Sequence, residues 1–174
     1  MNNLIKKSIL LTIFIAVIGQ TQAQTRKILF DADWKFHKVE LTEQAGKADF
    51  DDSAWRIVNL PHDWSIEGAP AEDEPSGNDG GYRPTGKGWY RKTITLNKQD
   101  FGKDGKTAKR WSLYFEGVYM NAEVFVNGKS LGTHHYGYSA FTHDITDLIH
   151  TGSNTIAVSV DNSKQKNSRW YTGS

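Results

Sequence analysis

The sequence contains no cysteine, which excludes disulfides and thiolate metal sites. It also has little net charge, because 21 Lys and Arg stand against 20 Asp and Glu. Lys6 and Lys7 lie in a segment that we expect to be removed, and without them 19 basic residues face the 20 acidic ones, a net charge of −1. This balance gives no electrostatic argument for nucleic acid or an anionic membrane as a partner.

An apolar run near the start, Ile9–Ile18, follows a short basic region and precedes small and polar residues. This order is typical of a secretory signal peptide. A membrane anchor is the alternative, but a run of about 10 residues is too short to cross ~30 Å of hydrocarbon. We therefore predict a signal peptide over residues 1–23, cleaved after Ala23, and export to a bacterial periplasm with no membrane attachment afterwards.

The full sequence is rich in aromatic residues and glycine, with six Trp, seven Tyr, eight Phe and 16 Gly. This composition favours an all-β domain with many turns. A jelly-roll β-sandwich is the expected form. The Asn127-Gly128 pair predicts a tight hairpin within residues 122–134, because both turn positions need positive φ. We expect the other strands in residues 28–36, 55–60, 89–96, 111–117, 140–149 and 154–162, with one helical turn in 43–53.

Residues 62–88 show neither a strand nor a helix period and hold six glycines and three of the chain's four prolines. Long irregular loops in compact domains are often functional. The acidic middle, residues 72–79, is equally compatible with a disordered surface insertion. Both interpretations stay open at this point.

Sequence patterns for catalysis, cofactors or metals are weak. No G-x-G-x-x-G follows a strand into a helix, so a nucleotide site has no support. Glu116 and Glu123 are candidates for a carboxylate pair, but charged residues on strands usually lie on exposed faces. His134 and His135 are adjacent and point to opposite faces of a strand, and His143 and His150 follow at no metal-binding spacing. We therefore predict no catalytic residue, cofactor or metal in this chain.

The sequence gives more support for carbohydrate binding, because sugars pack on aromatic rings and hydrogen-bond to polar groups around them. Pro61–Trp64 ("PHDW") and Ser168–Tyr171 ("SRWY") both offer this mixture. Trp64 and Trp170 are candidate sugar platforms. The alternative is structural: both rings fill the core, since large aromatic side chains usually do.

Five separated motifs occur in order: "DADWKF", "FDDSAWRIVNLPHDW", "GKGWYRKTITL", "LYFEGVYMNAEVFVNGKSLGTHHYGYSAFTHDITDLI" and "NTIAVSVDNSKQKNSRWYTGS". Together they resemble the N-terminal sugar-binding domain of glycoside hydrolase family 2, in its β-galactosidase branch. The resemblance implies a jelly-roll domain over residues 24–174, truncated at its C-terminal end. It also implies partner domains of a larger enzyme, among them a TIM barrel that supplies two catalytic glutamates for hydrolysis with retention.

The resemblance further implies that three positions border the pocket of the terminal sugar, namely Asp63, Lys87 and Arg169. The better-known galactosidases carry an acidic residue near the position of Arg169 and an amide near that of Lys87. The expected function is sugar binding within a secreted β-galactosidase, and the chain alone is predicted to be inactive. A free-standing carbohydrate-binding module, a purely supporting interface domain, and the same domain of a β-glucuronidase or β-mannosidase are the alternatives.

Overall fold

The computed structural model describes residues 25–38, 43–102 and 109–164. The chain divides into two compact units, one ending at Phe30 and the other starting at Asp31. Residues 25–30, the described part of the first unit, have no regular secondary structure. Within the three ranges, no helix is both long enough and apolar enough to cross a bilayer. The predicted signal peptide, Arg169 and Trp170 lie outside the described residues.

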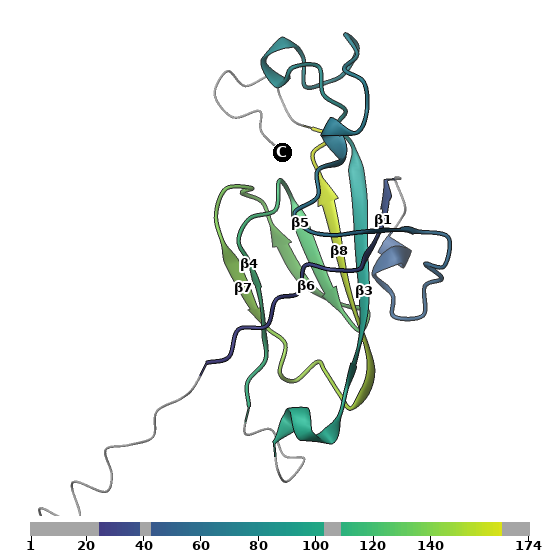
Figure 1. The fold of residues 1–174 in the computed structure, drawn as a ribbon. Helices are drawn as coiled ribbons and strands as arrows, with labels where there is room; N and C mark the ends of the chain where they lie inside the picture. The colour runs from purple at the N-terminus through teal and green to yellow at the C-terminus, as the bar shows by residue number, and fades with distance from the viewer. Residues whose placement is uncertain (1–24, 39–42, 103–108, 165–174) are drawn as a thin grey trace, which may run out of the picture. The chain divides into compact units, whose positions relative to one another are not determined.

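In its described residues the second unit consists of β-strands with short 3₁₀ helices in the connections that precede β4, and turns and loops elsewhere (Figure 1). Six strands form one sheet in the order β2-β1-β3-β8-β5-β6, and β4 and β7 form a second sheet. All pairs are antiparallel. The prediction of an all-β fold is therefore confirmed. The strands are β1 (Trp34–Lys38), β2 (Arg56–Val58), β3 (Lys87–Leu96), β4 (Ser112–Phe115), β5 (Ala122–Val126), β6 (Lys129–His134), β7 (Phe141–Asp144) and β8 (Gly152–Asp161).

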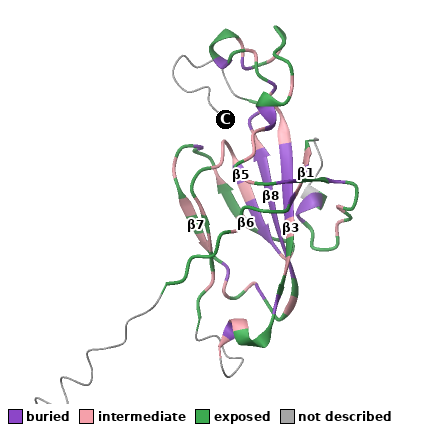
Figure 2. Ribbon diagram, in the orientation of Figure 1, coloured by how far each residue is buried: buried purple, intermediate pink, exposed green. Residues whose placement is uncertain are grey.

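The long strands β3 and β8 form the centre of the larger sheet, paired from Lys87 with Asp161 to Leu96 with Gly152. Both are mostly buried, whereas β6 and β7 at the margins are more exposed (Figure 2). A central strand that is buried on both faces needs apolar or small residues at nearly every position. The sequence Thr155–Val160, which is entirely buried, meets that need.

The two faces of the six-stranded sheet are buried in different ways. On one face, aliphatic residues of β8 such as Val158 lie beside Val124 of β5, its pairing partner. On the other face, Trp89 and Phe125 form a cluster with Trp55, which comes from the segment that crosses the sheet between β1 and β2. The rings of Trp89 and Phe125 lie 5.6 Å apart, within the range of favourable aromatic pairs.

Arg91 attaches the crossing segment to the sheet, although its side chain is only 1% exposed. Its guanidinium donates to Asp52 Oδ2 at 2.9 Å and to the carbonyl oxygens of Ala45 and Lys47 at 2.5 and 2.9 Å. Lys35 Nζ lies 2.5 Å from the other oxygen of Asp52. A buried guanidinium needs such partners, because an uncompensated buried charge costs several kcal/mol, on the order of 3–5.

The Asn127-Gly128 hairpin is confirmed. Asn127 and Gly128 have φ values of 50° and 84°, and the turn pairs Val126 with Lys129. Positive φ at both positions fits the strand twist, and the Asn-Gly sequence permits it at low cost. The Asn127 side chain also accepts from the backbone N–H of Thr155 at 2.9 Å, which ties the turn to β8.

Several predicted boundaries shift in the structure. The opening strand begins at Trp34 and not at Ile28, and its partner β2 pairs only with Trp34–Phe36. The helical turn expected in residues 43–53 is present as the 3₁₀ helix η1 (Glu43–Gly46). A further 3₁₀ helix, η4 (Lys98–Phe101), follows β3.

The long loop is more ordered than its sequence indicates. It contains the 3₁₀ helices η2 (Trp64–Ile66) and η3 (Asn78–Gly80), and its last two residues already belong to β3. The acidic middle folds into hydrogen-bonded turns, in which Glu74 N–H donates to the Ala71 carbonyl and Gly77 N–H to the Glu74 carbonyl, both at 3.0 Å. Glu74 accepts from the backbone of Thr85 at 3.0 Å. The structure thus shows a folded loop where a disordered insertion was the alternative.

Candidate functional site

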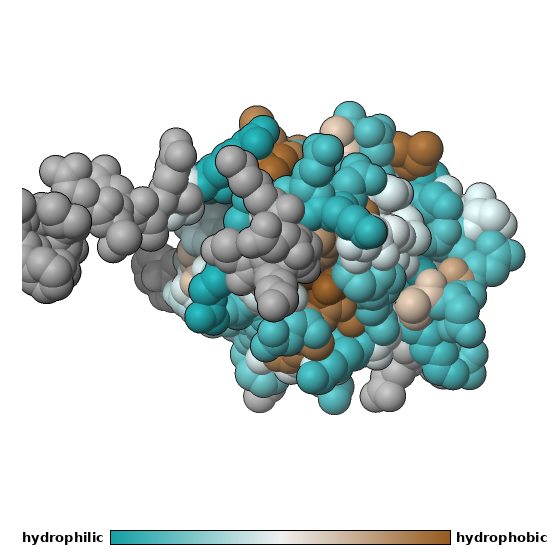
Figure 3. Space-filling view, turned by 90° about the horizontal axis from the view of Figure 1, so that it is seen from below, coloured by the Kyte–Doolittle hydropathy of each residue, from teal (hydrophilic) through white to brown (hydrophobic). Residues whose placement is uncertain are grey.

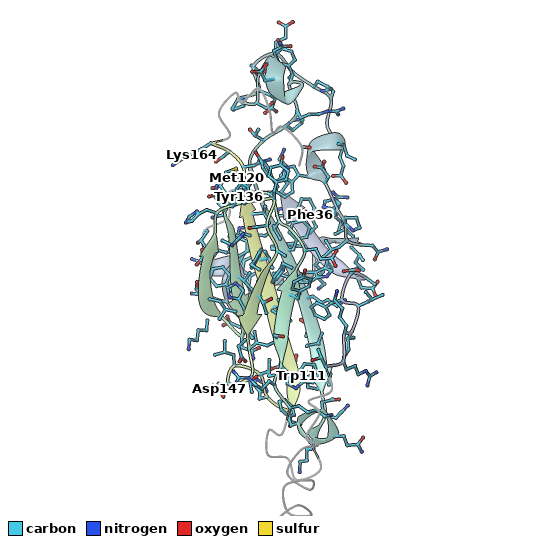
Figure 4. All side chains as sticks on the ribbon, turned by 90° about the vertical axis from the view of Figure 1, so that its left-hand side faces the viewer. Phe36, Trp111, Met120, Tyr136, Asp147 and Lys164 are labelled. Atoms are coloured by element: carbon cyan, nitrogen blue, oxygen red, sulfur yellow. The ribbon has the colours of Figure 1, made fainter. Side chains whose placement is uncertain are left out.

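Three segments meet where Lys87 pairs with Asp161. We call this end of the sheet the exit end, because the chain leaves β8 here. The backbone of Asn162 donates to the Gly86 carbonyl at 3.0 Å, and its side chain accepts from Gly86 N–H at 2.8 Å. A Cβ added at Gly88 would lie 2.7 Å from the ring of Trp64, so the "PHDW" loop packs against the start of β3. Lys164, the last described residue, is at this end in Figure 4.

Asp63 lies at the exit end and caps η2. Its backbone is extended, with φ of −128°, and its Oδ1 accepts from the backbone N–H of Ser65 at 2.8 Å. The carboxylate is half-buried and held by this local bond. A carboxylate has about four acceptor positions, so it can accept further bonds from hydroxyl groups of a ligand.

Trp64, the residue after the cap, has a packing role in the structure. It is only 6% exposed and stacks on Phe36 with ring centroids 5.7 Å apart and an interplanar angle of 16°. The missing side chain at Gly88 leaves room for its ring. This is the structural alternative that the sequence left open, and contact of Trp64 with a sugar stays a prediction.

A polar network anchors the same loop to β2 and β3. His62 Nδ1 lies 2.7 Å from the Tyr90 hydroxyl, and His62 Nε2 lies 3.0 Å from Glu67 Oε1. Arg56 donates to the other oxygen of Glu67, and this bond holds the pKa of the Glu67 carboxyl below its usual range. Burial, and then the nearby Asp63 carboxylate, raise the pKa of Tyr90, so its hydroxyl remains protonated. The network fixes the loop that carries Asp63.

A groove of about 460 Å³ runs beside η2. It combines aromatic rings with cationic and anionic side chains, the mixture that polar ligands such as sugars require. Arg56 lies over the ring of Phe36, 4.9 Å from its centroid, and both residues line the groove. The lining residues are Phe36, His37, Lys38, Ala54, Arg56, Trp64, Glu67, Gly68 and Pro84.

Lys87 starts β3 at the exit end, but its side chain lies on the other face of the sheet. Its Nζ is 5.5 Å from the Trp89 ring centroid, whereas the next residue, Gly88, faces Trp64. Lys87 lines a second groove, of about 810 Å³, together with Glu123. The structure thus brings the Lys87 backbone close to the Asp63 loop and directs its side chain elsewhere.

The acidic and histidine candidates have other surroundings. Glu123 on β5 accepts from Ser130 Oγ at 2.6 Å, while Glu116 is exposed just beyond β4. In the described part of the chain, no three His, Asp or Glu side chains gather as a metal site. The partners of the histidines are those of folded loops: His134 with Ser139, His135 with Asn121 and His150 with the Thr151 carbonyl.

The site contains residues for which the sequence gives no signal. Arg56 and Glu67 lie 11 positions apart, and nothing in their spacing indicates an ion pair around His62. The network forms because the chain bends at Pro61, so that the start of β2 lies close to Glu67, the residue after η2. Only the "PHDW" motif itself marked the region beforehand.

The chain matches the family model described as glycosyl hydrolases family 2, sugar binding domain, over residues 30–174. It is 48% identical over 145 residues to a β-galactosidase of Bacteroides ovatus, covering 83% of this chain and 16% of that protein. It is 40% identical over 162 residues to a putative β-glucuronidase of Formosa agariphila, covering 93% and 15%.

Among solved structures, it is similar to a β-glycosidase from Bacteroides vulgatus, with a TM-score of 0.76 and 43% identity. That match covers 83% of this chain and 18% of the other. The chain therefore spans less than a fifth of the length of these relatives. From the family match over residues 30–174, the chain belongs to glycosyl hydrolase family 2, in which it corresponds to the N-terminal sugar-binding domain.

Proposed function

We propose that this chain is the sugar-binding domain of an exported β-galactosidase that hydrolyses terminal β-galactosides with retention. The observation that carries the proposal is the placement of Asp63: a half-buried carboxylate held by the Ser65 backbone at the exit end of a family 2 domain. The domain supplies hydrogen-bond acceptors to the sugar. Bond cleavage belongs to the two glutamates of the barrel in the family's larger enzymes.

A neutral galactoside fits this site better than a glucuronide. A carboxylate at the sugar position attracts hydroxyl donors but repels the carboxylate of a uronic acid. The similarity to the Bacteroides ovatus β-galactosidase, at 48% identity, points the same way as this electrostatic argument. Relatives named as β-glucuronidases make the opposite specificity the alternative to be tested.

We further propose how the two sheets are connected, how the protein is exported and which domains it contacts. The two sheets are those of a jelly-roll sandwich, and the signal peptide over residues 1–23 directs the protein to the periplasm. The other domains of the parent enzyme are the protein partners. The chain alone has no catalytic pair and hydrolyses nothing, and its affinity for galactosides is weak.

The test joins residues 24–174 to family 2 enzymes whose own matching first domain has been deleted. One acceptor is the Bacteroides ovatus β-galactosidase and the other is the Bacteroides fragilis β-glucuronidase. We expect the chain to restore hydrolysis of aryl β-galactosides by the first acceptor and little hydrolysis of aryl β-glucuronides by the second. Both intact parents and both deleted acceptors serve as controls.

Restoration of the β-glucuronidase alone would contradict the galactoside assignment. Restoration of neither acceptor would contradict the role as a sugar-site domain. Turnover of an aryl β-galactoside by residues 24–174 alone would show that the chain carries catalytic residues.

A further inference from the structure

Three tyrosines come together on two loops of the second unit. Tyr119 lies in the loop between β4 and β5, and Tyr136 and Tyr138 lie in the loop between β6 and β7. The ring centroids of Tyr119 and Tyr138 are 5.3 Å apart, and those of Tyr136 and Tyr138 are 5.9 Å apart. Both pairs meet edge to face at 61°, so the rings form one continuous cluster.

The two loops are locked to each other. A Cβ at Gly137 would lie 2.9 Å from the Tyr119 backbone, so only glycine allows this approach. Asn121 Oδ1 also lies 2.9 Å from His135 Nδ1, which joins the two loops a second time. Rings that are held in place before binding lose less conformational entropy when a ligand arrives.

The tyrosine cluster lies at the exit end. The backbone N–H of Asp161 donates to the Met120 carbonyl at 2.9 Å, and Asn121 Nδ2 donates to the Asp161 carbonyl at 2.9 Å. Asp161 is the residue that pairs with Lys87. Figure 4 shows Met120, Tyr136 and Lys164 together at this end, opposite Trp111 and Asp147.

The cluster is unusually exposed for large aromatic residues, since Tyr136 is 60% and Tyr138 47% exposed. Tyrosine combines an apolar ring, on which the C–H face of a sugar can pack, with a hydroxyl for its polar edge. The Asn121 amide and the His135 imidazole, which bond to each other, add polar groups beside the rings. A neutral sugar ring finds both kinds of contact here.

We infer that the tyrosine cluster is a second carbohydrate subsite, which binds a neutral sugar of the glycan chain that follows the terminal galactoside. The inference rests on the proposed function in one respect. It requires that the terminal galactoside lies at the Asp63 loop and that the rest of the glycan extends from there. Tyr136 is the outermost ring and packs on the sugar, while Tyr138 and Tyr119 support it from behind. The subsite thus favours oligosaccharides over single sugars.

A surface of this kind also suits contact with another protein domain. Tyrosine is also common in protein interfaces, but the position of the cluster at the exit end, which carries the Asp63 loop, favours sugar. Contact of this surface with protein alone is one possible outcome of the test that follows.

The test titrates the full mature chain with β-1,4-galactotetraose and, in parallel, with galactose, while the NMR signals of the tyrosine rings are followed. We expect the tetraose to shift the signals of Tyr136 and Tyr138 and to bind more tightly than galactose. Tyr136→Ala should weaken tetraose binding about tenfold. Tyr136→Phe should retain most of the affinity, because the ring remains.

Tyr114→Ala is the matched control, since Tyr114 is another exposed tyrosine, on β4, at 52% exposure. It should leave the affinity for the tetraose unchanged. Unshifted tyrosine signals, or equal affinity of the wild type and Tyr136→Ala, would overturn the inference and assign the surface to protein contact. The measurement needs no hydrolysis, so its failure is distinct from that of the fusion assay, which tests the proposed function.

Discussion

The two ends of the β3–β8 pair differ in what their polar and aromatic groups contact. Where Leu96 pairs with Gly152, the Asn154 amide makes four hydrogen bonds and is 0% exposed. Its Nδ2 donates to the carbonyls of His150 and Gly152 at 2.7 and 3.1 Å, and its Oδ1 accepts from His150 N–H and Asn127 Nδ2, both at 2.9 Å. At the exit end, tyrosine rings and the Asp63 loop remain accessible.

At one end of the β3–β8 pair the polar groups are bonded within the protein, and at the other end groups remain that a ligand can contact. The end with η4 is largely hydrophilic, with separate apolar spots, in the part that Figure 3 shows. Its polar groups close loops: Trp111 N–H, for example, donates to Thr146 Oγ1 at 2.8 Å. Such polar groups are used within the protein, whereas a carboxylate such as that of Asp63 has acceptor positions besides the one that binds Ser65 N–H.

The largest expected effect breaks the closed end. Asn154→Ala removes four hydrogen bonds and leaves buried backbone groups without partners, which should lower the free energy of unfolding by about 3 kcal/mol. Asn154→Asp should also destabilise the domain, because an aspartate cannot donate to the His150 and Gly152 carbonyls. Urea unfolding at neutral pH measures both changes. A decrease in the free energy of unfolding no larger than that of a surface substitution would show that other contacts hold this end together.

The next effect concerns the buried ion pair between the two ends. Asp52→Asn removes the charge that faces Arg91 but keeps an amide oxygen as an acceptor, so it should cost about 2 kcal/mol at pH 7, less than a fully uncompensated charge. Burial opposes ionisation of Asp52, but the hydrogen bonds from Lys35 and Arg91 outweigh it and lower its pKa. The stabilisation is therefore present above about pH 4 and is lost as the pH falls through the lower folded-state value. Urea unfolding at pH 7 and pH 3 should show a smaller difference between wild type and variant at pH 3, and an equal difference would refute the linkage.

A smaller effect opens the exit end. Gly137→Ala forces a Cβ against Tyr119 and should lower the free energy of unfolding by about 1–2 kcal/mol. It should also change the NMR signals of the tyrosine cluster. Thermal unfolding together with the tyrosine spectra checks this. Unchanged spectra would mean that the loops are not locked at this contact.

The smallest effect on stability is expected for Tyr136→Ala. An exposed side chain outside the core contributes within about 0.5 kcal/mol. Thermal unfolding should therefore be close to that of the wild type, while binding of the tetraose weakens about tenfold. Strong destabilisation by this variant would show that Tyr136 is a packing residue, and the contrast between the two ends would disappear.

Local sequence signals predicted the parts of the fold that local chemistry determines. Asn127-Gly128 indicated its hairpin, because the turn needs positive φ at both positions. The strand expected at 89–96 lies within β3 (Lys87–Leu96). The opening strand was placed too early, since its start depends on the partner residues of β2, which are far away in the sequence.

The contacts of the candidate site depend on long-range neighbours, and the sequence predicted less of them. The motif "PHDW" located Asp63, but its role as the cap of η2 became visible only in the structure. The tyrosine cluster was missed because Tyr119 and Tyr138 are 19 positions apart and meet only when two loops pack together. The opposite direction of the Lys87 side chain likewise follows from its place in β3.

The most direct test of the account is the effect of Asp63 on hydrolysis in the fusion with the Bacteroides ovatus β-galactosidase. Asp63→Ala should lower kcat/KM for an aryl β-galactoside about a hundredfold. Asp63→Asn, which can still accept from Ser65 N–H, separates loss of the cap from loss of the charge. Asp147→Ala, an exposed residue at the far end, is the control and should leave kcat/KM unchanged. Equal kcat/KM for Asp63→Ala and the wild-type fusion would contradict the claim that this domain binds the substrate through the Asp63 loop.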